Sequence, residues 1–128
     1  MILYTVVPCY NEEDALPETV RILSDKYFTL MRKGMISEES RILLVDDGSS
    51  DDTWNMIREY HAKKPIFCGL KLSRNRGHQN ALYAGLMAAA PHCDAAISID
   101  ADLQDDVDAI DQMIVKFDDG YDIVYGVR

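Results

Sequence analysis

The stretch ILLVDDGS, residues 42–49, decides the fold class, because four consecutive apolar residues run directly into two aspartates and a turn. A strand that is apolar at every position must be covered on both faces, which is typical of parallel sheets flanked by helices. On either side of this stretch, short β-branched runs alternate with helical stretches about four times. The sequence therefore predicts a single α/β domain with a Rossmann-like, mostly parallel sheet, right-handed crossovers and helices on both faces.

The expected elements follow from periodicity and turn residues. One apolar stripe with spacings of three and four residues predicts a first helix that Asp14 can cap. A later helix is rich in small residues, which favours close packing on the sheet. The predicted strands are residues 3–7, 42–45, 66–72, 96–99 and 122–125, and the predicted helices are 15–32, 53–62, 79–90 and 107–119.

Composition excludes several classes of protein. The 128 residues carry a net charge of −9, which argues against nucleic acid as the main partner, because phosphate backbones bind to basic faces. The sequence has no run of about 18 apolar residues, and it does not begin with a basic segment followed by an apolar one, as a secretory signal peptide would. We therefore expect a cytoplasmic chain without a membrane-spanning segment. Cys9, Cys68 and Cys93 are far apart, which predicts free thiols and no structural zinc site.

Four polar clusters directly follow the first four predicted strands. In a parallel sheet the carboxyl ends of the strands meet at one edge, and ligands bind there near the topological switch point. The loops at this edge carry chemistry more often than packing. The clusters are PCYNEE (8–13), DDGS (46–49), SRNRGH (73–78) and DADLQ (100–104).

Asp100 and Asp102 are the sharpest pair among these clusters. Residues two apart in an extended segment point to the same side, so the two carboxylates repel unless a cation lies between them. Oxygen-only ligands select a hard ion such as Mg²⁺ or Mn²⁺, and Gln104 adds a neutral oxygen. The competing interpretation is a solvated acidic turn at the start of the next helix.

The other clusters suit a nucleotide, with a structural alternative for each. Tyr10 offers a face for stacking on a base, Glu12 offers an acceptor, and Asp46 or Asp47 can accept from a base or a ribose. Turn formation and helix capping explain the same residues equally well. The basic loop 73–78 could attract phosphate or pair with nearby carboxylates. The absence of Gly-x-Gly-x-x-Gly and of a P-loop disfavours a dinucleotide cofactor and a P-loop nucleotide site.

With these clusters in order, the chain resembles the inverting family 2 glycosyltransferases of the GT-A fold. It is most similar to the branch with polyprenyl phosphate acceptors, the dolichyl-phosphate mannosyltransferase and bactoprenol glucosyltransferase type. The resemblance spans nearly the whole chain. It is carried by VPCYNE (7–12), VDDGSSD (45–51), LSRNRGHQ (72–79), DADLQ (100–104) and YGVR (125–128).

The resemblance implies a role for each matching position. One set of residues would bind a nucleotide diphosphate sugar, either a UDP-sugar or a GDP-sugar. An overlapping set would bind a divalent cation, Mg²⁺ or Mn²⁺. Asp47, rather than Asp46, would be the acid that binds the base. The nucleotide-sugar residues would be Pro8, Tyr10, Glu12, Val45, Asp47, Asp100, Ala101, Asp102 and Arg128, and the metal ligands Asp100, Asp102 and Gln104.

The resemblance also sets expectations for the whole protein. Relatives are roughly twice as long, so residues 1–128 would be the nucleotide-sugar-binding part of a GT-A domain that is truncated at its C-terminal end. The acceptor would be a polyprenyl phosphate or a glycan. Membrane contact would come only through the missing part, at the cytoplasmic face, and an exposed apolar side could form a homodimer. No residue stands out as the catalytic base.

Three alternatives remain open at this point. A receiver-like, Mg²⁺-binding signalling domain has a similar size and fold, but it needs an acidic pair after the first strand, where this chain has Pro8-Cys9-Tyr10. A sugar nucleotidyltransferase needs a Gly-rich phosphate loop at the same place. A non-catalytic fragment that still binds the nucleotide sugar would keep all four clusters.

Overall fold

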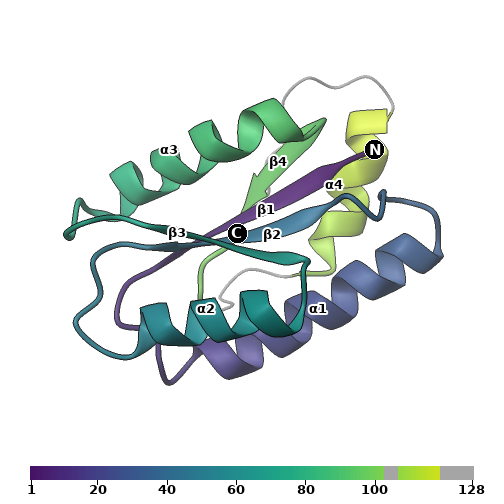
Figure 1. Ribbon diagram of the computed structural model, residues 1–128. Helices are drawn as coiled ribbons and strands as arrows, with labels where there is room; N and C mark the ends of the chain where they lie inside the picture. The colour runs from purple at the N-terminus through teal and green to yellow at the C-terminus, as the bar shows by residue number, and fades with distance from the viewer. Residues whose placement is uncertain (103–106, 119–128) are drawn as a thin grey trace.

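The computed structural model describes residues 1–102 and 107–118, and Figure 1 shows its layers. Four parallel strands form one sheet in the order β3-β2-β1-β4. The predicted strand at 122–125 lies outside the described residues. The strands are β1 (Leu3–Cys9), β2 (Arg41–Asp46), β3 (Phe67–Lys71) and β4 (Ala95–Ser98).

Helices cover both faces of this sheet, as the apolar strands require. In Figure 1, α3 lies on one side of the sheet, and α1 and α2 lie on the other. The apolar residues of α4 belong to the same core as those of α1 and α2. The helices are α1 (Leu16–Arg32), α2 (Thr53–Lys63), α3 (His78–Ala89), the short 3₁₀ helix η1 (Ala90–His92) and α4 (Ala109–Asp118).

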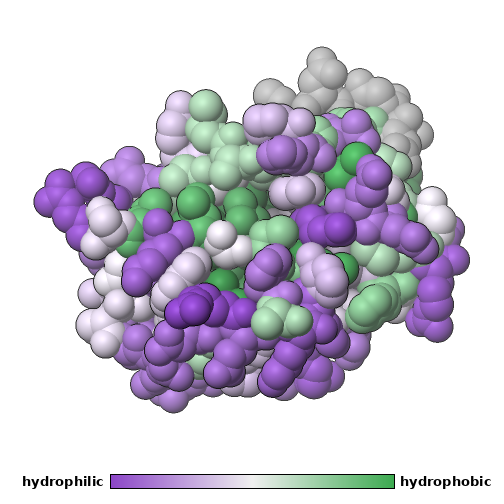
Figure 2. Space-filling view, viewed as in Figure 1, coloured by the Kyte–Doolittle hydropathy of each residue, from purple (hydrophilic) through white to green (hydrophobic). Residues whose placement is uncertain are grey.

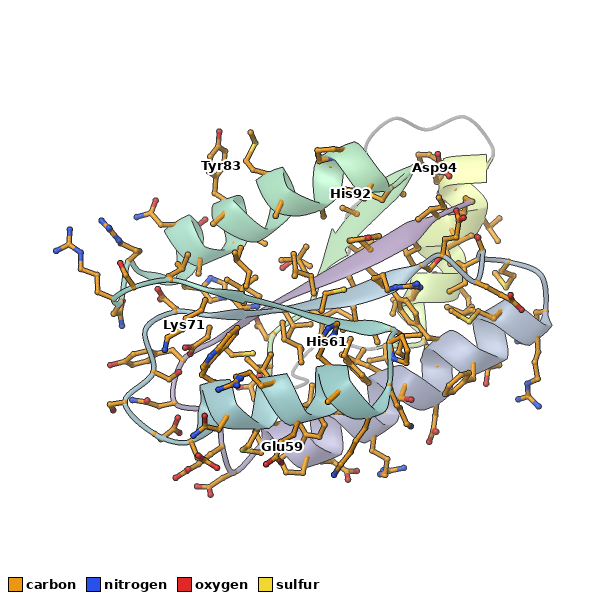
Figure 3. All side chains as sticks on the ribbon, viewed as in Figure 1. Glu59, His61, Lys71, Tyr83, His92 and Asp94 are labelled. Atoms are coloured by element: carbon orange, nitrogen blue, oxygen red, sulfur yellow. The ribbon has the colours of Figure 1, made fainter. Side chains whose placement is uncertain are left out.

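The direction of the chain across the sheet reverses after β3. From β1 the chain steps outward to β2 and then to β3, and through α3 it returns to the far side of β1 as β4. The edge between β1 and β4 is therefore the switch point at which ligands of such sheets bind. In Figure 3, Lys71 marks the carboxyl end of β3, and Asp94 lies toward the opposite end of the sheet, just before β4.

Small residues on α3 allow it to lie close to the sheet, as the sequence predicts. A Cβ atom on Gly85 would lie 2.4 Å from Val6 Cγ1 and 2.9 Å from Val45 Cγ2. Ala81 and Ala89 are fully buried on the same side. This close approach fixes the start of α3, at His78, above the ends of β1 and β2. Within the described ranges, no helix is long and apolar enough to cross a bilayer.

The start of α1 differs from expectation at its cap. Ala15, rather than Asp14, occupies the N-cap position, and no side chain caps this helix. The Glu12 carbonyl instead accepts hydrogen bonds from the N–H groups of Ala15 and Leu16, at 3.1 and 2.9 Å. The backbone of the loop after β1 thereby satisfies the first N–H groups of the helix, so loop and helix are joined without an acidic cap.

Candidate functional site

Hydrogen bonds fasten the loop after β1 to the turn after β2. Asn11 Oδ1 accepts from the Ser50 N–H at 2.8 Å, and the Asn11 N–H donates to Ser49 Oγ at 2.9 Å. The Glu12 N–H donates to Thr53 Oγ1 at 3.0 Å. Asn11 has a φ of +51°, a left-handed conformation that asparagine tolerates better than most residues. This double loop places Tyr10 and Glu12, on either side of Asn11, at the carboxyl edge of the sheet.

The two aspartates that end β2 have different environments. Asp46 is fully buried, and its Oδ1 accepts from the Ser49 N–H at 3.1 Å, so it closes the turn that leads into α2. Asp47 is 3% exposed and lines a pocket, and its Oδ1 accepts from the Arg76 N–H at 2.7 Å. Asp46 therefore supports the turn, whereas Asp47 faces the space in which a ligand would lie.

The pocket has a volume of about 180 Å³ and lies where three of the four clusters meet. Tyr10 is 46% exposed and presents its ring at this edge. Four of the predicted nucleotide-binding residues line the pocket, together with Cys9, two residues of the loop between β3 and α3, and the first residue of α3. The lining residues are Pro8, Cys9, Tyr10, Glu12, Asp47, Asn75, Gly77 and His78.

The three residues that the third cluster, 73–78, contributes to the pocket were not among the predicted nucleotide-binding residues. Charge made Arg74, Arg76 and His78 candidates for phosphate binding, but Arg76 reaches Asp47 through its backbone N–H. Gly48 is the sequence signal for this contact, because a Cβ atom there would lie 2.3 Å from the backbone of Arg74 and Asn75. The loop therefore crosses directly over the turn after β2. Figure 2 shows a strongly hydrophilic surface where it projects.

Asp100 and Asp102 lie next to this pocket. Ile99 and Ala101 are buried, while Asp100 is half-buried and Asp102 is exposed, so both aspartates reach solvent on either side of a buried residue. Asp100 Oδ1 lies 3.5 Å from Nε2 of His78, the first residue of α3. All four clusters thus meet at one edge of the sheet.

Neighbouring carboxylates at this edge affect the pKa of Glu12. Burial chiefly raises the pKa of Glu12 above its ordinary value, and the charges of Asp102, Asp51 and Asp100 raise it further. Burial, followed by the charges of Glu12 and Asp46, raises the pKa of the Cys9 thiol, which keeps it protonated and a poor nucleophile. The arrangement suits binding of a cation and an anionic ligand better than covalent chemistry at Cys9.

The donor set at this edge fits a divalent cation that is shared with phosphate groups. In the described part of the chain, no three His, Cys, Asp or Glu side chains are arranged to hold a metal ion. Mg²⁺ commonly takes only one or two carboxylates from a protein and completes its shell with substrate phosphates and water. Asp100 and Asp102 supply such a pair. Gln104 and Arg128 lie outside the described residues.

Val45 and Ala101 are core residues in this structure. The Val45 side chain is fully buried between β2 and α3, beside Gly85. The Ala101 methyl group belongs to the core formed by α1 and α4. Neither residue lines the pocket. Their contacts with a nucleotide sugar stay predictions, and each residue also supports the edge from below.

Sequence comparison finds relatives along nearly the whole chain. Residues 4–128 match the profile of glycosyl transferase family 2. The uncharacterized glycosyltransferase YkoT of Bacillus subtilis (strain 168) is 47% identical over 127 residues, which are 99% of this chain and 38% of YkoT. An undecaprenyl-phosphate 4-deoxy-4-formamido-L-arabinose transferase of Klebsiella pneumoniae is 40% identical over 124 residues, 96% of this chain and 36% of that protein. The chain spans little more than a third of these relatives.

Solved structures share the fold of this chain, and one of them is a mannosyltransferase. The mannosyltransferase PcManGT of Pyrobaculum calidifontis, in complex with GDP-Man and Mn²⁺, has a TM-score of 0.65 and 22% identity, over 78% of this chain and 27% of its own. S. aureus TarS 1-349 in complex with UDP has a TM-score of 0.65 and 20% identity, over 91% of this chain and 32% of its own. The predicted GT-A fold is thereby confirmed. With a family profile that matches residues 4–128, the chain belongs to glycosyl transferase family 2.

Proposed function

We propose that this chain binds the donor in a metal-dependent, inverting glycosyltransferase that moves a sugar from a nucleotide diphosphate sugar to a polyprenyl phosphate. One observation carries the proposal. A pocket at the carboxyl ends of β1 and β2, with an aromatic ring and a buried carboxylate, lies beside the pair of aspartates that follows β4. A base in the pocket would direct its diphosphate toward that pair.

The nucleotide end of the pocket is supported by the contacts of Asp47. One of its oxygens holds the Arg76 N–H, which leaves the other oxygen able to accept from a ring N–H of a base. The exposed ring of Tyr10 offers a stacking face. Both uracil and guanine carry ring N–H donors, so a UDP-sugar and a GDP-sugar both fit this chemistry.

At the phosphate end, a divalent cation when bound would neutralise the charge that builds on the departing diphosphate. Asp100 and Asp102 would hold it, with Gln104 as the expected third ligand. His78 would lie between Asp100 and the pocket. The first N–H groups of α3 are at the same place, and a helix N-terminus favours an anion. The residues of the chain thus bind and orient the donor.

A phosphate acceptor explains why no base needs to be found in this part of the protein. A phosphate monoester has its second pKa near 6 and is already anionic at neutral pH, so it can attack the anomeric carbon from the face opposite the diphosphate without losing a proton. The Klebsiella relative is named an undecaprenyl-phosphate transferase, which supports a polyprenyl phosphate. Such an acceptor would place the full protein at the cytoplasmic face of a membrane.

Calorimetric titration of UDP and GDP, in Mn²⁺ or in EDTA, tests the proposal. We expect one of the two nucleotides to bind more tightly in Mn²⁺ than in EDTA, and we expect D102N to abolish this difference in affinity. The matched control is D25N, because Asp25 is an exposed aspartate on α1 that lies outside the pocket. Equal affinity in Mn²⁺ and EDTA would contradict the metal role, and no binding of either nucleotide would contradict the donor site. Binding without any transfer to lipid phosphate by the full-length protein would favour a non-catalytic binding fragment.

A further inference from the structure

A buried contact fastens the loop that carries Asp100 and Asp102 to α1. The Thr19 hydroxyl donates a hydrogen bond to the carbonyl of Ala101, the residue between the two aspartates. Thr19 is 2% exposed and Ala101 is 4% exposed. Because water does not reach this hydrogen bond, nothing else is available to replace it, and the carbonyl would be left unpaired without the hydroxyl.

The Thr19 hydroxyl serves the loop rather than its own helix. Threonine hydroxyls inside helices commonly bond back to the carbonyl four residues earlier. Here the Ala15 carbonyl receives the Thr19 N–H at 3.2 Å, as part of the helix ladder, while the hydroxyl bonds to Ala101 instead. The hydroxyl thus links two segments that are 82 positions apart in the sequence.

The link falls where the sheet stops holding the chain. β4 ends at Ser98, and the Ile99 N–H still donates to the Val6 carbonyl at 3.1 Å. Two residues later the Ala101 carbonyl is held by Thr19, and the Ala101 methyl group is packed into the core. Fixing Ala101 fixes the peptide plane that leads into Asp102, and it keeps the aspartates on the outward side.

We propose that Thr19 is a positioning residue, whose hydroxyl holds Ala101 so that Asp100 and Asp102 face a divalent cation together. This inference rests on the proposed function, because it assigns the cation to those two carboxylates. It adds a residue on α1 that touches neither the nucleotide pocket nor the cation. Groups that hydrogen-bond directly to metal ligands commonly change metal affinity by 10- to 100-fold when they are removed, and Thr19 acts one step away, on the peptide group that leads into Asp102.

The expected effect is confined to the metal-dependent part of binding. In T19V the side chain keeps its shape and loses its hydroxyl, so the Ala101 carbonyl is released. We expect Mn²⁺ affinity to fall about tenfold or more. Nucleotide affinity in EDTA should not change, because Thr19 does not line the pocket. A general loss of structure would lower both affinities, which separates positioning from stability.

The first measurement titrates each variant with Mn²⁺ alone and monitors free Mn²⁺ by its electron paramagnetic resonance signal. The second titrates UDP and GDP by calorimetry, in Mn²⁺ or in EDTA. T5V is the matched control, because Thr5 is also fully buried and bonds to the Tyr27 hydroxyl at 2.6 Å, away from the aspartates. If T19V does not fold, T19S and T19A provide the comparison, since both lose the methyl group and only T19S keeps the hydroxyl.

The outcomes are distinct. Weaker Mn²⁺ binding in T19V or T19A, with T19S and T5V close to wild type, supports the positioning role. Unchanged Mn²⁺ affinity in T19V and T19A, while wild type shows its metal-dependent gain, overturns that role and leaves the proposed function standing. Absence of any Mn²⁺-dependent binding in wild type overturns the proposed function and, with it, the role of Thr19.

Discussion

Replacing Gly48 by alanine tests how closely two loops must meet to form the pocket. Gly48 has a φ of +69°, and a Cβ atom there would lie 2.3 Å from both Arg74 C and Asn75 N. Gly34 offers a matched control, because it has a φ of +72° and nothing within 4 Å of the added Cβ atom. The left-handed backbone costs an L-residue about 1–2 kcal/mol at either position, so any difference between G48A and G34A reports the collision.

The collision falls on backbone atoms, so no side chain can swing away to relieve it. The loop between β3 and α3 has to move, and with it the Arg76 N–H that donates to Asp47 Oδ1 at 2.7 Å. A hydrogen bond to a charged group contributes about 1.5–3 kcal/mol. We therefore expect G48A to be about 1.5–3 kcal/mol less stable than G34A.

The same movement displaces Asn75, Gly77 and His78, which line the pocket. We expect the nucleotide affinity of G48A to fall about tenfold or more, since 1.4 kcal/mol corresponds to a factor of ten. Urea unfolding measures the first effect, and calorimetry with UDP or GDP in Mn²⁺ measures the second. If G48A and G34A had equal stability and equal nucleotide affinity, the loop would not depend on the missing side chain, and our account of the pocket would be wrong.

Two further predictions concern carboxylates at the same edge. D47N should keep the acceptor for the Arg76 N–H but lower nucleotide affinity about tenfold. D46A should leave nucleotide affinity nearly unchanged and lower the free energy of unfolding by about 1.5–3 kcal/mol, because Asp46 accepts the hydrogen bond that closes the turn. Calorimetry measures the affinities and urea unfolding the stabilities, and an exchange of the two effects would refute this reasoning. Burial and neighbouring acids raise the pKa of Glu12, so the folded protein holds this proton more tightly than the unfolded chain does. The protonated side chain therefore contributes to the free energy of unfolding at low pH. This contribution is lost as pH rises from the unfolded pKa of about 4.3 through the higher folded pKa. E12Q should remove this decline in urea unfolding measured across that range, and an identical pH dependence in wild type and E12Q would contradict it.

The fold class could be predicted because burial leaves a direct trace in the sequence. The run Ile42–Val45 is apolar at every position because β2 lies inside the sheet, between β1 and β3, with helices on both faces. The cap of α1 could not be predicted, because it depends on the path of the preceding loop. Ala15 has no capping side chain, and the carbonyl of Glu12 does the work that Asp14 was expected to do.

Some residues of the candidate site could be predicted from the sequence, and others depend on contacts between distant segments. Pro8, Tyr10, Glu12 and Asp47 could be predicted as pocket residues because each lies at or just beyond the carboxyl end of β1 or β2, and the topology brings these ends to one edge. Asn75 and Gly77 were missed as pocket residues because their place depends on how the third loop crosses Gly48, a contact between segments far apart in the sequence. Charge in that loop was a poor guide, since Arg76 contributes its backbone N–H to the site.

Buried residues beneath the site position the side chains that the sequence motif names. Asp100 and Asp102 are visible in the sequence, but the spacing of two carboxylates says only that they share a side. Their direction is set by Ala101, whose methyl group is packed in the core and whose carbonyl is held by Thr19. Thr19 carries no charge and lies inside a helix, so no local pattern marks it. A relative could therefore keep both aspartates and still bind its cation weakly, if the residue on α1 lost its hydroxyl.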